Sequence, residues 1–220
     1  YDTLGATCAR QPALATRTAD SKQRQACSTP PPLAYIVGRI AGLENATVAM
    51  EPTVGTGMLL IGAGPNTVIA ANAIDPLRAQ LFANVYGVQA VMIDASTPGF
   101  VQWATQQKPD VVVSNPPFGT VLDENSNAKP FEIPGGTETT RSVHIAIMMN
   151  TLAAMPKGAR AVFIIAAKTG TPGASISPFR SQRVKEYLNR DYVRLFQEHK
   201  VEEMFTVDGG LYRKMGAGWP

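Results

Sequence analysis

The chain has 220 residues, of which 45% are hydrophobic, and it carries 20 Lys and Arg against 17 Asp and Glu. This balance excludes a disordered or collagen-like chain, and no apolar run reaches the roughly 18 residues that a membrane span needs. We therefore expect one soluble domain with a sizeable core.

Charge is divided unevenly along the chain. Residues 1–39 carry a net charge of +3, residues 40–140 one of -6, and residues 141–220 one of +6. An acidic middle between basic flanks suits a small cationic ligand in the centre and a polyanion held from the sides. Solvated surface helices explain the basic run from Arg180 to Arg194 equally well.

Residues 1–27 are predicted to be an N-terminal extension of loop or loosely docked helix, because they lack clear periodicity. The chain begins with Tyr1 and no basic-then-apolar leader follows, as is typical of a fragment or a processed chain without a targeting signal. Cys8 and Cys27 lack metal-ligand spacing and suit free thiols in a reducing compartment, so we expect a cytoplasmic protein.

The segment Ser28-Thr29-Pro30-Pro31-Pro32 predicts the start of a helix. A hydroxyl side chain can cap the first turn, and the prolines already hold φ near the helical value. The apolar face of this helix is expected at Leu33, Ile36, Val37 and Ile40.

Short β-branched runs then alternate with loop and helix-like sequence. They predict strands at 47–50, 67–71, 88–93, 110–113 and 159–166, with a helix over 145–154 before the last. Residues 201–207 and the turn at 208–210 predict a closing hairpin whose second strand has barely begun at Pro220. The alternation predicts a mostly parallel α/β sheet with helices on both faces, which binds ligands at the carboxyl ends of its strands.

The first predicted strand is followed by Glu51-Pro52-Thr53-Val54-Gly55-Thr56-Gly57. Glycines let the backbone turn sharply near a ligand, and the Glu51 carboxylate can accept hydrogen bonds from an amine or hydroxyls. The segment lacks the glycine spacing of a dinucleotide site and the Lys-Ser/Thr pair of a P-loop. An acid here would repel pyrophosphate and attract a cation, which favours the sulfonium cofactor S-adenosylmethionine.

The fourth predicted strand ends in Asn115-Pro116-Pro117-Phe118. Two prolines fix φ and remove two backbone donors, so the Asn115 side chain and the Pro116 carbonyl are expected to be rigid acceptors. The N–H groups of a nucleobase amine would satisfy both acceptors and localise the nitrogen lone pair for attack on a methyl group. Phe118 would then stack on a flipped base, whereas the alternative is a Pro-Pro turn with a core Phe.

These two segments together resemble the amino-group DNA methyltransferases, in particular the adenine-N6 type. Ser28–Ala34 is similar to the family's N-terminal cofactor motif, and the order of the three motifs resembles the gamma subgroup. Ser28–Tyr35 and Val207–Arg213 look like the methylase modules of phage or plasmid helicase-like proteins of the strawberry-notch kind, similar to an anti-restriction protein. The resemblance implies a Rossmann-like methyltransferase fold with residues 28–220 as the catalytic domain, in a bacterial cytoplasm.

The resemblance also implies roles for single residues. Thr29 and Pro30 would line the methionine end of S-adenosylmethionine, and Asp94 would accept from its adenine amine. The amino-acid part of the cofactor would be held by Glu51, Pro52 and the Thr53–Gly57 backbone, including Gly55. The target amine would be held by Asn115 and Pro116, with Pro117 in the same turn, and Phe118 would stack on its ring. No metal is required.

One position departs from the family pattern. The acid that binds both ribose hydroxyls at the end of the second strand is replaced by Ala73. An unpaired, desolvated pair of hydroxyls would weaken binding by a few kcal/mol. Asp75 lies on the same face as Ala73 and can substitute, whereas Asn72 faces the opposite way.

Three further segments have open interpretations. The long polar loop over 119–138 suits a segment that orders when substrate arrives. His144 can lie near the target base, although a histidine on the surface of a helix is the commoner explanation. Lys168–Gly173 can contact phosphate or form a plain turn, and the apolar residues at 145–152 are most simply core.

The sequence thus predicts methyl transfer from S-adenosylmethionine to adenine N6 in DNA, with a flipped adenine as substrate. A helicase-like region attached to the same parent chain is an expected partner, and no membrane is expected. Methylation of guanine N2 in RNA or of a protein glutamine is an alternative. A second alternative, suggested by Ala73, is a catalytically dead DNA-binding or anti-restriction module.

Overall fold

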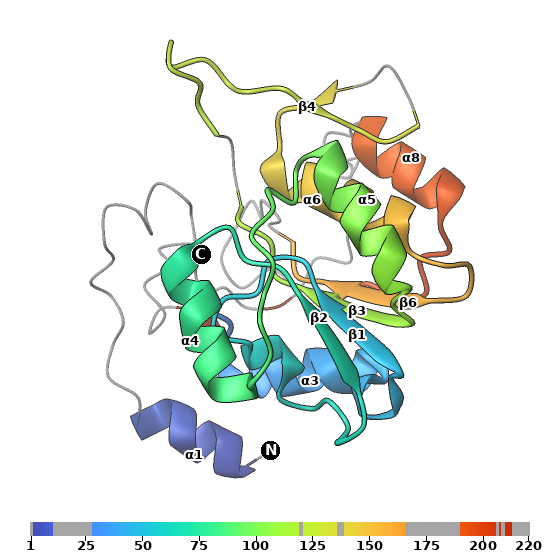
Figure 1. The fold of residues 1–220 in the computed structure, drawn as a ribbon. Coiled ribbons are helices and arrows are strands. Elements are labelled where there is room, and N and C mark those ends of the chain that lie inside the picture. Colours follow the sequence, from blue (N-terminus) through green and yellow to red (C-terminus); the bar gives the residue numbers. More distant parts are fainter. Residues whose placement is uncertain are drawn as a thin grey trace.

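A parallel four-stranded sheet forms the centre of the computed structural model, which describes residues 2–10, 28–118, 121–135, 139–165, 190–205, 207 and 210–212. The strand order is β2-β1-β3-β6, and every neighbouring pair is parallel. The strands are β1 (Val48–Glu51), β2 (Val68–Ala71), β3 (Val111–Ser114) and β6 (Arg160–Phe163). The predicted mostly parallel α/β sheet is confirmed (Figure 1).

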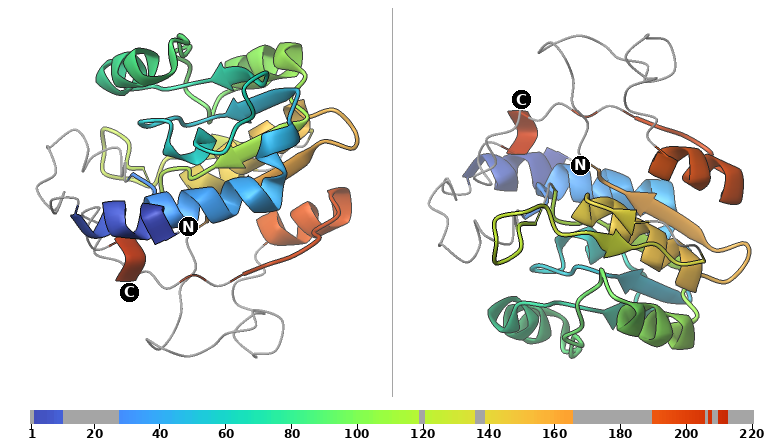
Figure 2. Two further views of the ribbon diagram at one scale, coloured as in Figure 1. Left: turned by 90° about the horizontal axis from the view of Figure 1, so that it is seen from below. Right: turned by 90° about the horizontal axis from the view of Figure 1, so that it is seen from above.

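Alternate residues of the strands enter two different cores. Ala49 and Val113 pack toward α3 (Pro31–Ala41) and α4 (Pro76–Tyr86) on one side. Met50 and Val112 pack toward α5 (Pro98–Gln107) and α6 (Val143–Ala154) on the other. Because both faces are covered, strands such as Val111–Ser114 are apolar and buried along their whole length (Figures 1 and 2).

Helix α3 begins at the predicted prolines, but its cap differs from the prediction. The N-cap residue is Pro30, which makes no side-chain capping hydrogen bond, and Gly42 ends the helix with φ at 75°. The Thr29 hydroxyl accepts a hydrogen bond from Asn115 Nδ2 at 3.0 Å. Prolines at the first helical positions leave fewer backbone donors for a cap to satisfy.

Two predicted strands are wrong, and one predicted helical connection is shorter than expected. The 88–93 strand is reduced to a single parallel bridge between Asn72 and Val91. The β1–β2 connection holds a 3₁₀ turn, η2 (Met58–Leu60), instead of a helix, since four glycines and two prolines interrupt it. Residues 201–205 and 207 form no strand, and the turn residues Asp208 and Gly209 lie outside the described residues.

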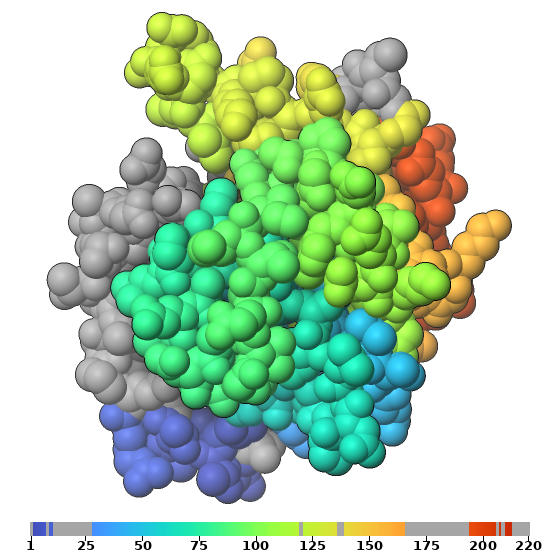
Figure 3. Space-filling view, in the orientation of Figure 1, coloured from blue at the N-terminus to red at the C-terminus, as the bar shows by residue number. Residues whose placement is uncertain are grey.

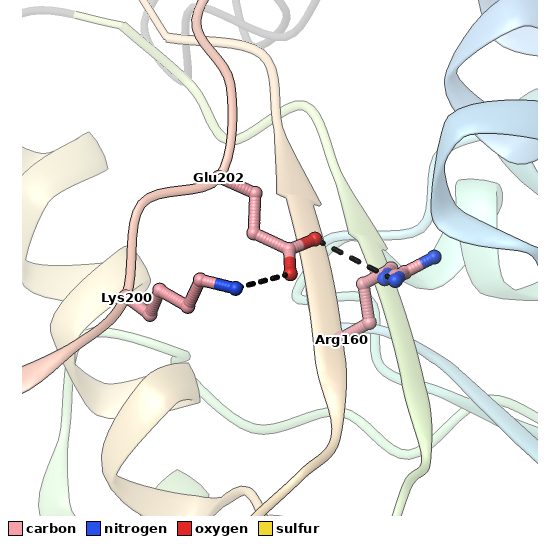
Figure 4. A network of polar contacts seen from close by, with 3 residues as sticks. All are labelled: Arg160, Lys200 and Glu202. Atoms are coloured by element: carbon pink, nitrogen blue, oxygen red, sulfur yellow. Dashed lines mark hydrogen bonds and ion pairs between the residues drawn. The ribbon is translucent and has the colours of Figure 1, made fainter.

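The segment after α8 (Arg190–Glu198) makes ion pairs at the surface of the molecule. Glu202 pairs with Arg160 at the start of β6, at 3.5 Å, and with Lys200, at 3.3 Å (Figure 4). All three side chains are more than half exposed, so the pairs contribute little stability.

The loop predicted over 119–138 carries order of its own in residues 121–135. Leu122 and Ala128 form an antiparallel bridge, and β4 (Phe131–Glu132) pairs with β5 (Thr139–Thr140). Residues 121–130, which we call the arm, project from the body of the molecule at the top of the view (Figures 1 and 3). The apolar residues of α6, including Ile145, Met148 and Met149, are core as predicted.

The N-terminal part of the predicted extension contains α1 (Asp2–Arg10), which contacts α3. Residues 11–27, with Cys27, lie outside the described residues, as do Lys168–Gly173. None of the helices in the described ranges has the length and apolar character that crossing a membrane requires.

Candidate active site

A cavity of about 410 Å³ opens at the carboxyl ends of the central strands. This volume lies within the range of roughly 300–1,000 Å³ that is usual for small organic ligands. The predicted site residues that the cavity brings together come from five separate segments of the sequence. The predicted site residues that line it are Thr29, Glu51, Pro52, Thr53, Gly55, Asp75, Asp94, Asn115, Pro116, Pro117 and Phe118.

Two predicted residues do not line the cavity. Pro30 is the buried N-cap of α3. Gly57 lies behind the cavity wall with φ at 80°, where an added Cβ would come within 2.4 Å of Tyr86 Cε2. The Gly57 carbonyl accepts a hydrogen bond of 2.6 Å from the Tyr86 hydroxyl, so Gly57 shapes the turn that other residues use.

Glu51 is an isolated acid at the end of β1. Its side chain is 4% exposed, and among the described residues its Oε2 has no hydrogen-bond partner. Burial raises the pKa of Glu51 to about 8, so this carboxyl is mostly protonated at pH 7. A buried acid without a partner destabilises the fold unless a ligand uses it, and a cationic ligand would favour its ionised form.

The end of β2 is organised by Asn72. Its Nδ2 donates to the carbonyls of Pro52 and Ile93, and its Oδ1 accepts from the Ile93 amide, at 2.8 to 2.9 Å. All of its polar atoms are therefore engaged in joining three neighbouring segments. Asn72 and the neighbouring Ala73 both line the cavity, and the Ala73 side chain brings no polar atom to it.

Asp75 and Asp94 reach the cavity with part of their carboxylates already engaged. Asp75 Oδ1 caps α4 by accepting from the amides of Leu77 and Arg78. Asp94 Oδ1 accepts from the Ser96 amide at 2.9 Å and from its hydroxyl at 2.7 Å. Local backbone donors thus fix the direction of each carboxylate.

The turn after β3 forms another part of the cavity wall. Asn115 Nδ2 donates to Thr29 Oγ1 at 3.0 Å and to the Tyr212 hydroxyl at 3.5 Å. Just before it, Ser114 Oγ lies 3.4 Å from Thr53 Oγ1, which joins this turn to the Glu51 turn. The carboxyl ends of β1 and β3 are adjacent, so a ligand held at one reaches the other.

Phe118 and His144 form an aromatic pair beside this turn. Their ring centroids are 6.2 Å apart and their planes are nearly perpendicular, at 88°. His144 is only 8% exposed, so the interpretation of a surface histidine is wrong. Val143 and Phe131 also line the cavity and extend this apolar wall.

Several lining residues were missed by the sequence reasoning. Arg78 comes from α4, and Lys129 and Phe131 come from the arm and β4. Tyr212 reaches Asn115 from 97 residues further along the chain. Arg78, Lys129 and Phe131 belong to no motif, and the resemblance of Val207–Arg213 implied no role for Tyr212, so only the three-dimensional fold brings these residues to the site. Among the described residues, no group of three or more His, Cys, Asp or Glu could hold a metal ion.

Comparisons with known proteins find resemblance at the level of solved structures. No family model matches the sequence, and no curated protein matches it. TrmN from Thermus thermophilus is similar over 67% of this chain and 41% of its own, with 21% identity and a TM-score of 0.44. A protein described as an RNA methyltransferase from Pyrococcus horikoshii is similar over 76% of this chain and 74% of its own, with 13% identity and a TM-score of 0.47.

A third similar structure is described as a modification subunit of a type I restriction enzyme from Vibrio vulnificus. It matches over 64% of this chain and 34% of its own, with 16% identity and a TM-score of 0.46. This chain therefore spans less than half the length of TrmN and of the modification subunit. At these identities the assignment of a function depends on the cavity itself.

Proposed function

We propose that this chain is an S-adenosylmethionine-dependent methyltransferase that acts on the N6 amine of adenine in DNA. The observation that carries the proposal is the meeting of two turns in one cavity. The buried, unpartnered Glu51 follows β1, and the rigid Asn115–Phe118 turn follows the adjacent strand β3. The first suits a cationic cofactor and the second suits an amine that donates two hydrogen bonds.

The residues present fit most of the cofactor. Glu51 would bind its ammonium group, and the Pro52–Gly55 backbone and Thr29 would surround the amino-acid part. Asp94 keeps one carboxylate oxygen outside its bonds to Ser96 and would accept from the adenine amine. The ribose would make the fewest polar contacts, because Ala73 is apolar and Asp75 already uses Oδ1 to cap α4.

The cofactor supplies an electrophilic methyl group on a positively charged sulfur. Asn115 Oδ1 and the Pro116 carbonyl would accept the two N–H bonds of the target amine and direct its lone pair at the methyl carbon. With the C–N bond forming and the C–S bond breaking, these acceptors would stabilise the positive charge on the nitrogen. The surplus proton then leaves the nitrogen to water.

The test is calorimetric titration of the folded protein with S-adenosylmethionine, with Glu51→Gln and Asn115→Ala in parallel. We expect micromolar binding that Glu51→Gln weakens at least tenfold and Asn115→Ala retains. Methyl transfer from labelled cofactor to DNA is then measured. Asn115→Ala should bind the cofactor as the wild type does but transfer no methyl group. Folded protein that neither binds nor transfers would refute the proposal.

The nucleic-acid partner follows from the same wall of the cavity. Phe118, held edge-on against His144, would stack on an adenine swung out of the duplex. We propose that an attached helicase-like region delivers the strand. Parallel assays with DNA and RNA of one sequence decide between adenine N6 and the alternative, guanine N2.

Ala73 favours a second candidate function, a nucleic-acid-binding module without methyl transfer. The ribose-binding acid is replaced by Ala73, and the neighbouring Asn72 is wholly engaged in structural hydrogen bonds. This candidate predicts DNA binding without detectable heat on titration with S-adenosylmethionine.

A further inference from the structure

We propose that Tyr212 is a positioning residue that orients the Asn115 side chain for the target amine. The proposal rests on the proposed function and adds to it a residue for which the sequence implied no role. Tyr212 follows Asn115 by 97 residues and lies only 8% exposed.

The Tyr212 ring is anchored in the larger of the two cores. It packs in the cluster that includes Leu33 and Val37 of α3 and Val113 of β3. Because packing fixes the ring, the position of the Tyr212 hydroxyl is fixed as well. The hydroxyl is directed at Asn115 Nδ2, at 3.5 Å.

The two hydroxyls lie against the nitrogen of the Asn115 amide. An asparagine Nδ2 has two N–H donors, and here Thr29 Oγ1 takes one at 3.0 Å while the Tyr212 hydroxyl lies within reach of the other. With its nitrogen held by two oxygens, Asn115 keeps Oδ1 for other partners. A flipped amide would turn Oδ1 toward the two hydroxyls, which can also donate, and would then offer its Nδ2 donors to an amine that has only donors to give.

Tyr212 acts through Asn115, so its removal should change orientation more than binding. Tyr212→Phe keeps the ring in the core and deletes one oxygen. We expect kcat for methyl transfer to fall about tenfold, the factor that 1.4 kcal/mol of lost transition-state stabilisation gives, with affinity for S-adenosylmethionine unchanged. Tyr35→Phe is the matched control, because Tyr35 lies outside the cavity and should keep full activity.

A second readout does not depend on catalysis. The side-chain amide protons of Asn115 are assigned in nitrogen-proton spectra by their disappearance in Asn115→Asp. In Tyr212→Phe one of the two should shift and exchange faster with water, while Thr29→Val should affect the other. Tyr35→Phe should leave both unchanged.

Each outcome decides the proposal. A slower kcat together with altered Asn115 signals supports it, and an unchanged kcat or unchanged signals in folded Tyr212→Phe overturns it. If the wild-type protein transfers no methyl group to any nucleic acid, the proposed function fails. The Asn115 signals then decide alone whether Tyr212 holds this amide, and unchanged signals refute that as well.

Discussion

At the scale of single residues, Glu51 carries the largest electrostatic cost in the site. It is buried without a hydrogen bond on Oε2, and burial raises its pKa to about 8 from 4.5. Its pKa is thus raised by folding, so its contribution to stability is present below pH 4.5 and is lost as the pH rises through 8. In the pH range where the cofactor would need Glu51 ionised, the ionisation of this buried acid destabilises the folded protein.

Stability and binding should therefore respond to pH in opposite directions. Between pH 5 and pH 9, the free energy of unfolding of the wild type should fall relative to that of Glu51→Gln, by about 1.4 kcal/mol per unit at most. Denaturant titrations at the two pH values measure this difference. A constant difference would show that Glu51 does not change its ionisation in this range.

Affinity for S-adenosylmethionine should instead increase from pH 6 to pH 7.5, because binding must remove the Glu51 proton. The expected change is up to tenfold per unit, and calorimetry in two buffers of different ionisation enthalpy should detect the released proton. Glu51→Gln should bind weakly with no such release. Equal affinity at both pH values in the wild type would contradict this coupling.

At the scale of the elements, the Glu51–Gly57 turn depends on α4 as much as on its own sequence. Gly57 has a positive φ, and the Phe82 and Tyr86 rings, which stack at 4.9 Å, occupy the space beside it. The sequence shows why a glycine is useful in a turn, but not which residues exclude a side chain there. That information lies in the packing of a helix that begins 19 residues later.

Gly57→Ala should destabilise the protein by about 2–4 kcal/mol, since the methyl group meets both the positive φ and the Tyr86 ring. Gly42→Ala is the matched control, with φ at 75° and no atom within 4 Å of the added Cβ. It should lose only about 1–2 kcal/mol. Thermal unfolding of the two variants measures the difference, and equal losses would show that the Tyr86 ring yields.

Element prediction from the sequence succeeded for all four strands of the central sheet, both the buried strands and the partly exposed β2 and β6. Val111–Ser114 and Val48–Glu51 are buried between two helical layers, and their apolar runs identify them. Val88–Ile93 is also mostly apolar but lies at the edge of the sheet, where a single bridge forms between Val91 and Asn72. Residues 201–205 and 207, where Glu202 and Glu203 interrupt the apolar residues, form no strand.

At the scale of the whole molecule, the sheet places the cavity and the other elements complete it. Motif residues at the ends of β1, β2 and β3 could be predicted to converge, because parallel strands share one carboxyl edge. Phe131, Arg78 and Tyr212 could not, because each enters through a connection whose path the local sequence does not specify. The motif residues of the site can thus be predicted from the local sequence, whereas the other residues reach the site only through the tertiary structure.

Hydrogen exchange should reflect the same division. Amides of β1 and β3, which are buried between the two cores, should exchange only on global unfolding. Amides of the arm, residues 121–130, are joined to the body by few buried contacts and should exchange orders of magnitude faster. Mass-spectrometric exchange on peptides measures both, and arm protection equal to that of β3 would contradict this division.

The number of residues between Asn115 and Tyr212 also affects the order in which the site can form during synthesis. A ribosome must add 97 more residues after Asn115 before Tyr212 exists. At about 5–20 residues per second, the strands β1, β2 and β3 and the cofactor turn precede Tyr212 by roughly 5–20 s. A nascent chain can therefore fold its ligand cavity before the Asn115 amide has its second hydroxyl partner.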